Sequence, residues 1–328
     1  MDRREFIRMS ATVAAGVAAS EIAGIAGTSS VTTVPAAGRA RAAYSSERGR
    51  ARAEDLTVRF LGTGAADWKG PDDRGEHRRL TSILVDGSIL VDLTSTDLDM
   101  LPKGARPRTI FYTHSHGDHY EPKAALQVGV TRVYVGETWL GKAREDFAAA
   151  AAESGVPAPE IVPLAIGQAV TVGDVTFTAL PANHATGRIE EETLMYLIEK
   201  GEVGAAPVRV LYATDTGGIP ARAARIAGID AHVKGGRPVT GLIMEATMGM
   251  GLAGDEDFRI FTHSSVDTVK RTADVLLATK RLVAPEGQPV YITHMARTLH
   301  GTQAELDAQL PVPLRAAYDG LEVVFRPV

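Results

Sequence analysis

Short apolar runs separated by polar turns recur along the chain, and most of these runs have the length of a β-strand. The clearest signals are two hairpins, in which paired apolar runs are separated by Asp86-Gly87 and by Gly173-Asp174. Gly and Asp between two apolar runs are a strong short-range signal for a tight hairpin turn. The predicted strands and hairpins comprise residues 56–61, 83–92, 109–112, 133–135, 169–180, 194–198, 208–212, 242–245, 290–293 and 321–325.

Helical stretches are interspersed with these strands. The longest is the alanine-rich stretch 139–153, which stops before Gly155, the residue type that most readily ends a helix. Shorter helices are predicted at 221–226, 264–279 and 302–309. Strands and helices that alternate in this way indicate a layered α/β fold. Because no interior linker breaks the pattern, we expect residues 54–328 to form one domain.

The first 53 residues have a different pattern, which predicts targeting instead of a folded unit. Arg3-Arg4-Glu5-Phe6-Ile7 precedes a weakly apolar, Ala- and Gly-rich run and resembles a twin-arginine export signal. An amphipathic helix with two surface arginines is the alternative. We assign residues 1–30 to a twin-arginine-type signal segment and residues 31–53 to a disordered linker. We therefore expect the twin-arginine export machinery as a partner and a periplasmic or extracellular location.

Composition restricts the chemistry further. The 328 residues include nine histidines and no cysteine. The lack of cysteine excludes disulfides, iron–sulfur clusters, thiolate-bound zinc and thiol nucleophiles, so any metal must be held by His, Asp or Glu. A formal net charge of −5, from 35 basic and 40 acidic residues, argues against a broad surface for nucleic acid. No stable nucleic-acid partner is expected.

Three imidazoles and one carboxylate follow the predicted strand 109–112 within six positions, as His114, His116, Asp118 and His119. Alternate residues of an extended segment face the same way, so His114 and His116 can bind one ion together. The chain then turns at a glycine, which directs the next two side chains to a second point. A polar surface loop is the alternative. The cluster favours a site for two neighbouring metal ions.

One cluster cannot complete two coordination spheres, so further ligands are needed. His184, Asp215 and His294 each follow a predicted strand or hairpin directly. A single histidine is more often structural than a ligand. All three lie at the exits of strands that could belong to one pair of sheets. The set is therefore stronger evidence for metal ligands than any one of the three residues alone.

At this point the chain resembles the metallo-β-lactamase superfamily of hydrolases, whose His-x-His-x-Asp-His motif is present in full. The resemblance implies an αββα four-layer sandwich, with two central mixed sheets flanked by helices, and two divalent ions. It assigns His114, His116 and His184 to one ion, Asp118, His119 and His294 to the other, and Asp215 as the bridge. Zn²⁺ is the expected metal for such ligands, although Mn²⁺ or Fe²⁺ also fit them.

The resemblance also implies hydrolysis by a hydroxide shared between the two ions and oriented by Asp118. Residues 60–66, 244–247 and 263–265 are similar to the branch that contains tRNase Z and cyclic phosphodiesterases. This branch implies that His263 is a general acid, whereas the alternative is that His263 caps the following helix. Met244 departs from the histidine that often precedes Glu-Ala-Thr in the tRNA-processing enzymes.

Three further residues are candidates for substrate binding. Arg78 or Arg79 could hold a phosphate oxygen, with a solvated surface charge as the alternative, and His300 could line the pocket. Export and the acidic composition favour a small-molecule phosphodiester as substrate. A lactonase or β-lactamase-like acyl hydrolase on the same metal site, and a catalytically silent metal-binding relative, are the alternatives. A homodimer remains open.

Overall fold

A computed structural model of the chain describes residues 52–201, 206–252 and 261–328. The predicted signal segment 1–30 and the predicted linker up to residue 51 lie outside the described residues. Among the described residues, no helix is both long enough and apolar enough to cross a bilayer.

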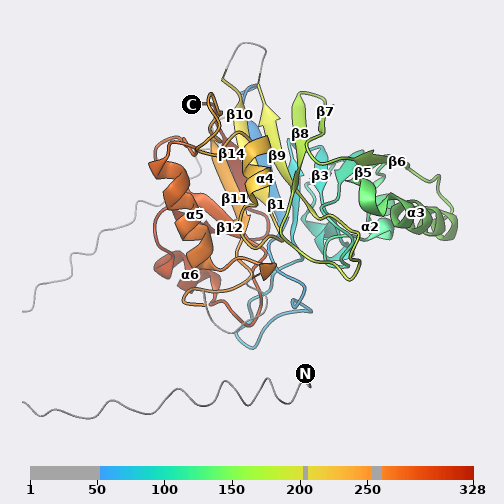
Figure 1. Ribbon diagram of the computed structural model, residues 1–328. Coiled ribbons are helices and arrows are strands. Elements are labelled where there is room, and N and C mark those ends of the chain that lie inside the picture. Colours follow the sequence, from blue (N-terminus) through green and yellow to red (C-terminus); the bar gives the residue numbers. More distant parts are fainter. Residues whose placement is uncertain (1–51, 202–205, 253–260) are drawn as a thin grey trace, which may run out of the picture. The chain divides into compact units, whose positions relative to one another are not determined.

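Two seven-stranded sheets form the centre of the described structure (Figure 1). The first has the order β14-β1-β2-β3-β4-β5-β6 and the second has the order β13-β12-β11-β10-β9-β8-β7. Both sheets are mixed, because β3 to β6 and β10 to β13 pair in parallel, whereas the other neighbouring strands pair antiparallel. The strands are β1 Leu56–Gly62, β2 Ser82–Val85, β3 Ile89–Val91, β4 Thr109–Phe111, β5 Arg132–Gly136, β6 Glu160–Leu164, β7 Ala169–Val172, β8 Val175–Pro181, β9 Leu194–Lys200, β10 Val208–Ala213, β11 Gly241–Glu245, β12 Val290–Thr293, β13 Leu314–Ala316 and β14 Glu322–Phe325.

Helices cover the outer face of each sheet, and Figure 1 shows α2 and α3 on one side of the sheets and α5 and α6 on the other. Apolar residues of α2 and α3 share one buried cluster with the first sheet, and those of α4, α5 and α6 share another with the second sheet. The predicted αββα four-layer sandwich is therefore confirmed. The helices are α2 Pro122–Val128, α3 Leu140–Ser154, α4 Ala221–Ile226, α5 Val266–Ala278 and α6 Gln303–Gln309, and the 3₁₀ turns are η1 Ser95–Met100 and η2 Glu137–Trp139.

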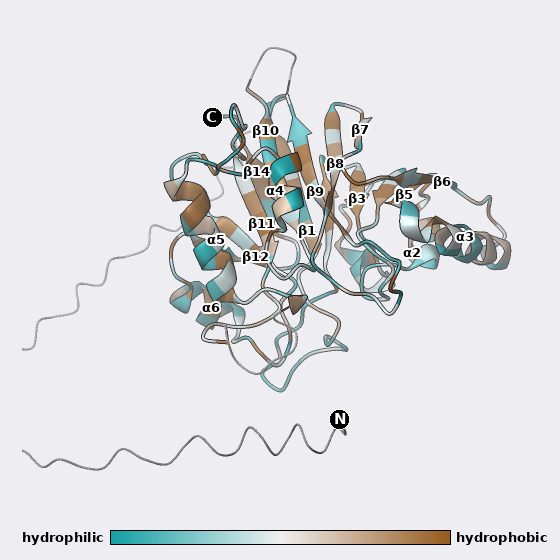
Figure 2. Cartoon of the chain, viewed as in Figure 1, coloured by the Kyte–Doolittle hydropathy of each residue, from teal (hydrophilic) through white to brown (hydrophobic). Residues whose placement is uncertain are grey.

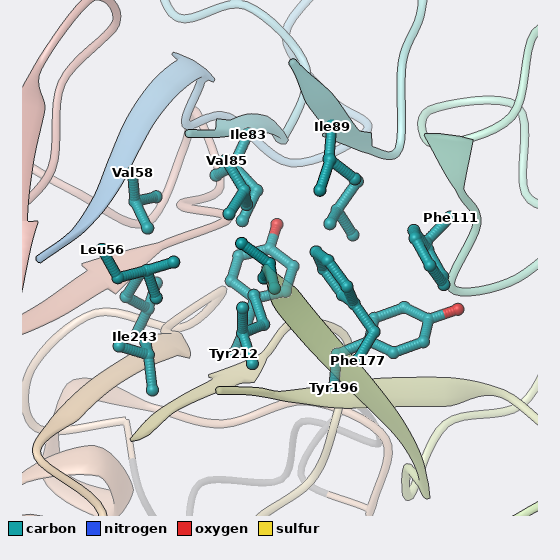
Figure 3. Packing of buried hydrophobic residues seen from close by; sticks show 14 of the residues in the cluster. Leu56, Val58, Ile83, Val85, Ile89, Phe111, Phe177, Tyr196, Tyr212 and Ile243 are labelled. Carbon is teal, nitrogen blue, oxygen red and sulfur yellow. The ribbon is translucent and has the colours of Figure 1, made fainter. Parts of the chain in front are cut away.

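The core between the two sheets is built around stacked aromatic rings (Figure 3). Phe111 of the first sheet stacks on Phe177 of the second, with ring centroids 4.2 Å apart, and Tyr196 meets Phe111 edge-on. Burial of each such ring contributes roughly 1.5–3 kcal/mol to folding. Figure 2 shows the consequence for the whole domain, with hydrophobic strands at the centre and hydrophilic segments on helices and loops outside.

The local turn chemistry agrees with the predictions. Asp86 and Gly87 both have positive φ, 44° and 66°, as a two-residue hairpin turn requires, and α3 ends at Gly155 with φ 65°. Among the α-helices and strands, three were not predicted. Helix α2 has only seven residues, β6 is an edge strand that contains Pro163, and β13 has three residues, so none carries a clear periodic signal.

Strand direction positions the functional residues. The parallel strands β3 and β4 of the first sheet end at one edge, as do β10, β11 and β12 of the second. Strand β8 runs the same way as β10, since both are antiparallel to β9. Carboxyl ends of parallel strands gather loops at one edge, where ligands bind in open α/β sheets. All seven predicted metal ligands follow strands that end at this edge.

Candidate metal centre

The predicted ligands come together as two groups of three. His114, His116 and His184 each offer a ring nitrogen, and these atoms lie within 4.8 Å of one another. Asp118, His119 and His294 form a second group within the same limit. Each of these two groups thus combines the loop after β4 with a strand exit of the second sheet.

Asp215 lies between the two groups. Its Oδ2 is 2.8 Å from Nε2 of His119 and 3.4 Å from Nε2 of His294. Its Oδ1 faces the other group, 3.8 Å from Nε2 of His184. One carboxylate therefore presents one oxygen to each group, which is the geometry that a bridging ligand needs.

Hydrogen bonds turn the imidazoles so that one ring nitrogen faces inward. Nδ1 of His119 lies 2.9 Å from Asp92 Oδ2, and Nδ1 of His294 lies 2.8 Å from the hydroxyl of Thr247. In both rings Nε2 is left to face the centre, 3.3 Å from its counterpart. Partners of this kind fix the ring orientation and the tautomer of a histidine ligand.

The first group is oriented in a similar way. Nδ1 of His184 donates to the carbonyl of Thr262 at 3.1 Å, and Nδ1 of His114 lies 2.9 Å from the hydroxyl of Thr113. His116 is the exception, because its Nδ1 faces the group, 3.2 Å from Nε2 of His184. The three rings therefore contribute two ε and one δ nitrogen.

A buried carboxylate clamps the backbone between the first two histidines. Oε1 of Glu191 accepts a hydrogen bond of 2.7 Å from the backbone N–H of Ser115, and Oε2 accepts one of 2.7 Å from its hydroxyl. Glu191 is 7% exposed and belongs to the loop between β8 and β9, which also carries His184. The clamp thus ties the loop of one ligand to the strand exit that carries two others.

The backbone adopts an unusual conformation at the strand exits. Five non-glycine residues in the described part of the chain have a left-handed φ, and three of them are here: Asp92 at 55°, Asp215 at 46° and His294 at 53°. Asp and His tolerate this region better than most residues. Such strain persists only where the surrounding structure holds it, and it is typical of functional sites.

The electrostatics keep the carboxylates ionised. Burial opposes the charge of Asp118, but the charge and hydrogen bond of His119 outweigh it and hold the pKa of Asp118 well below its ordinary value. The pKa of Asp215 is likewise well below its ordinary value, because neighbouring His294 and His119 outweigh burial. Burial, and then the charge of His119, lower the pKa of His114 well below its ordinary value, so this ring keeps a free lone pair.

His263 borders both groups. Its ring stacks on that of His294, with centroids 5.6 Å apart, and its centroid is 4.8 Å from that of His184. Nδ1 of His263 lies 3.1 Å from Oε1 of the buried Glu245. Helix α5 is capped by Ser265, whose hydroxyl accepts from the N–H of residue 268, so the imidazole is not its cap.

Arg78 and Arg79 have partners inside the protein. Arg78 is 4% exposed, and its guanidinium donates to the hydroxyl of Thr63 and the carbonyl of Ala317, both at 2.9 Å. Arg79 pairs with Asp99. These contacts join the end of β1 to later segments, and neither side chain is brought into the two groups.

His300 also lies beside the site without entering either group. Its Nε2 donates to the carbonyl of Ala246 at 2.7 Å. Burial lowers the pKa of His300 to about 4, so the ring is neutral near pH 7. The contact supports the segment that carries Glu245 and Thr247.

Sequence reasoning missed the residues that orient the ligands. Asp92 follows an apolar strand directly, as Asp215 does, so the same signal was present in the sequence. Glu191 lies in a charged stretch of loop, which favours a solvated position. Thr247 lies in the segment 244–247, whose similarity to a branch of the superfamily gave Thr247 no role. Their roles depend on contacts between distant segments, which no local pattern reveals.

Comparison with known proteins places the chain in a family. Residues 81–295 match the model of the β-lactamase superfamily domain. No curated protein matches the sequence. Similar solved structures include a diphosphatase of the PhnP family (TM-score 0.57, 22% identity, covering 83% of this chain and 98% of that chain) and Zn²⁺-bound PqqB from Methylobacterium extorquens (0.57, 17%, 81% and 99%).

Yeast PDE1 is a third (TM-score 0.54, 11% identity, covering 82% of this chain and 99% of that chain). At these identities the likeness demonstrates a shared fold. The family match covers more than half of the chain and includes all seven predicted ligands. The chain belongs to the β-lactamase superfamily, and its His/Asp clusters are those of a metal-dependent hydrolase.

Proposed function

We propose that the protein is a dinuclear-metal phosphodiesterase in which His263 is the general acid. The observation that carries this proposal is the pair of three-residue groups with Asp215 between them and His263 alongside. Zn²⁺ is the proposed metal, since imidazole and carboxylate ligands suit it. The substrate that we propose is a small phosphodiester.

The residues present fit two divalent cations. Nε2 of His114 is buried and has no hydrogen-bond partner among the described residues, although its Nδ1 is engaged. A buried nitrogen lone pair without a partner is costly unless it binds a ligand. His114, His116 and His184 would hold one cation, Asp118, His119 and His294 the other, and Asp215 both. Bound there, the two cations would supply Lewis acidity and an activated water as the nucleophile.

His263 has the position and the charge that a proton donor needs. Burial lowers its pKa, but the charge and hydrogen bond of Glu245, followed by the charge of Asp215, outweigh burial and raise the pKa of His263 to about 9. Because Nδ1 is held by Glu245, the proton on Nε2 is available for a leaving oxygen. An acid is most useful when the leaving group is a poor one, as an alkoxide of a phosphodiester is.

The name of one protein with this fold, a diphosphatase of the PhnP family, is consistent with a substrate that contains a phosphoryl group. The test is a panel of a chromogenic phosphodiester, a lactone and a β-lactam with the zinc-loaded protein. Fast turnover of the lactone or the β-lactam without phosphodiester cleavage would instead establish an acyl hydrolase, and no turnover at all would establish a silent metal-binding relative.

The role of His263 as general acid is tested by comparing substrates with different leaving groups. We expect His263→Ala to slow an alkyl phosphodiester about 10²–10⁴-fold, and to slow a p-nitrophenyl ester much less, because p-nitrophenolate leaves without a proton. His232→Ala is the matched control, since the side chain of His232 is 94% exposed. Equal losses on both esters would contradict the assignment of His263.

We also propose export through the twin-arginine route to the periplasm or the outside of the cell. The support is the pattern of residues 3–7, which precedes a weakly apolar run. Arg3→Lys combined with Arg4→Lys should keep the precursor inside the cell, as measured by fractionation and immunoblotting. Arg8→Lys is the control, and unchanged export of the double variant would refute the route.

A further inference from the structure

A pocket of about 690 Å³ adjoins the metal centre on the side of Asp118. Its walls come from the loop between β1 and β2, from η1 and from the turn at Gly117. The residues that matter here are Trp68, Lys69, His77, Leu80, Thr96 and Asp118. The volume is within the range of small-molecule sites. Because Asp118 also belongs to a proposed ligand group, the pocket lies beside the metal centre.

The wall formed by the β1–β2 loop is fixed by the segment that follows β12. Nε1 of Trp68 donates to the carbonyl of Met295 at 2.7 Å, and the backbone N–H of Arg297 donates to Asp67 Oδ1 at 2.9 Å. The N–H of Ala65 donates to the same carbonyl of Met295 at 3.1 Å. The pocket is therefore preformed, and a ligand need not order this loop in order to bind.

The wall offers a surface for a flat ring. Trp68 is 7% exposed and its only polar atom is engaged, so it presents hydrocarbon to the pocket. The imidazole of His77 lies beside it, with ring centroids 6.4 Å apart and planes at 54°. Leu80 adds an aliphatic side chain. Two tilted rings and an aliphatic group favour a planar partner that can stack and pack edge-on.

Lys69 is a hydrogen-bond donor of the pocket that a ligand can reach. Lys69 is exposed and forms no ion pair with any residue that the structure describes. The hydroxyl of Thr96 is engaged within the protein, since it accepts from the backbone N–H of Leu80 at 3.3 Å. Among the described residues that line the pocket, Asp118 is the single carboxylate, and the metal centre would neutralise it. The pocket therefore suits a ring that carries hydrogen-bond acceptors.

We propose that this pocket binds a nucleobase-like heterocycle on the ester arm of the substrate, with the ring against Trp68 and His77 and its acceptor atoms near Lys69. The inference rests on the proposed phosphodiesterase function, because that function brings a phosphodiester to the metal centre beside the pocket. His77 and Lys69 are then residues that determine specificity and take no part in bond cleavage.

The test compares two anions that differ by the ring alone. Isothermal titration of the zinc-loaded full chain with AMP and with ribose 5-phosphate should show AMP binding about tenfold more tightly. His77→Ala should remove most of this preference, and Lys69→Ala should reduce it, while His232→Ala should keep it. Equal affinities for the two anions, or a preference that survives in His77→Ala and Lys69→Ala, would overturn the proposal.

Hydrolysis of a chromogenic phosphodiester by the same preparations separates the two proposals. Turnover with no preference for AMP would refute the pocket and leave the phosphodiesterase in place. A ring preference that depends on His77, without phosphodiester turnover, would support the pocket and refute the proposed reaction.

Discussion

Asp92 Oδ2 lies 2.9 Å from Nδ1 of His119, and both side chains are fully buried. The carboxylate of Asp92 also accepts hydrogen bonds of 2.8 Å from the backbone N–H and from the hydroxyl of Thr113. One residue at the end of β3 therefore fixes both the ring of His119 and the strand exit that precedes His114. Both groups of metal ligands therefore depend on Asp92, although Asp92 belongs to neither group.

The first prediction concerns this carboxylate. Asp92→Asn keeps a residue type that tolerates positive φ but removes the charge behind His119. We expect zinc affinity at the group of Asp118, His119 and His294 to fall about 10–100-fold, as measured by competition with a chromogenic chelator. Asp86→Asn changes another left-handed aspartate, in the distant hairpin turn, and should leave the affinity unchanged. An unaltered affinity in Asp92→Asn would contradict the orienting role.

The second prediction concerns stoichiometry. His116 supplies the δ nitrogen of the first group, so His116→Ala leaves two ring nitrogens there and leaves the second group complete. Elemental analysis after gel filtration should give about two zinc ions for the parent protein and about one for the variant. Parent and variant should melt at similar temperatures without metal. Two ions retained by His116→Ala would rule out this division of ligands.

The third prediction concerns the clamp on Ser115. Glu191→Ala removes both acceptors and leaves the partly buried N–H of Ser115 without its partner, which lowers the free energy of unfolding by about 1 kcal/mol. The zinc affinity of the group His114, His116 and His184 should fall together with the stability. Glu191→Gln retains one acceptor and the shape, so it should recover most of both quantities. Denaturant unfolding and zinc titration measure them, and identical values for the Ala and Gln variants would argue against the clamp.

The fourth prediction concerns pH. Burial raises the pKa of Asp97 to about 7, from an ordinary value of 3.8, although the N–H and hydroxyl of Thr94 act in the opposite direction. The folded state therefore binds this proton more tightly. The stability that the protonated carboxyl confers is complete below about pH 4 and is lost as the pH rises through 7.

Asp97→Asn removes this dependence. The parent loses stability between pH 5 and pH 8, whereas the variant does not. We therefore expect the free energy of unfolding of the variant minus that of the parent to be about 1–3 kcal/mol higher at pH 8 than at pH 5. Urea unfolding of the metal-free proteins measures the difference. Asp73→Asn, at an exposed loop position, should show none. A relative stability that is flat between these pH values would contradict the shift at Asp97.

The sheets and the grouping of the candidate ligands were predictable because their signals are local. An apolar strand that ends in Asp or His is visible in the sequence, and His184, Asp215 and His294 each have that signature. Parallel strands then bring such exits to one edge without further information. The hairpin at Asp86-Gly87 was equally accessible, since its turn type depends on two residues.

The rest depends on contacts that sequence spacing does not encode. Arg78 lies in a run of charged residues that favours solvent, yet the structure buries it against Thr63 and Ala317 from opposite ends of the domain. Glu191 reaches Ser115 across 76 positions. The edge strand β6 carries Pro163, which weakens a strand signal that only pairing with β5 restores.

The left-handed residues at the strand exits have a consequence for how this site can change by mutation. At Asp215 and His294 the residue must supply a donor atom and also adopt a φ near 50°. Asp215→Glu would keep the carboxylate but lose a side chain suited to that backbone. A replacement that keeps only the donor atom is thus unsuited to these two positions. A different set of ligands would require a change in the conformation of the turn as well as in the side chain.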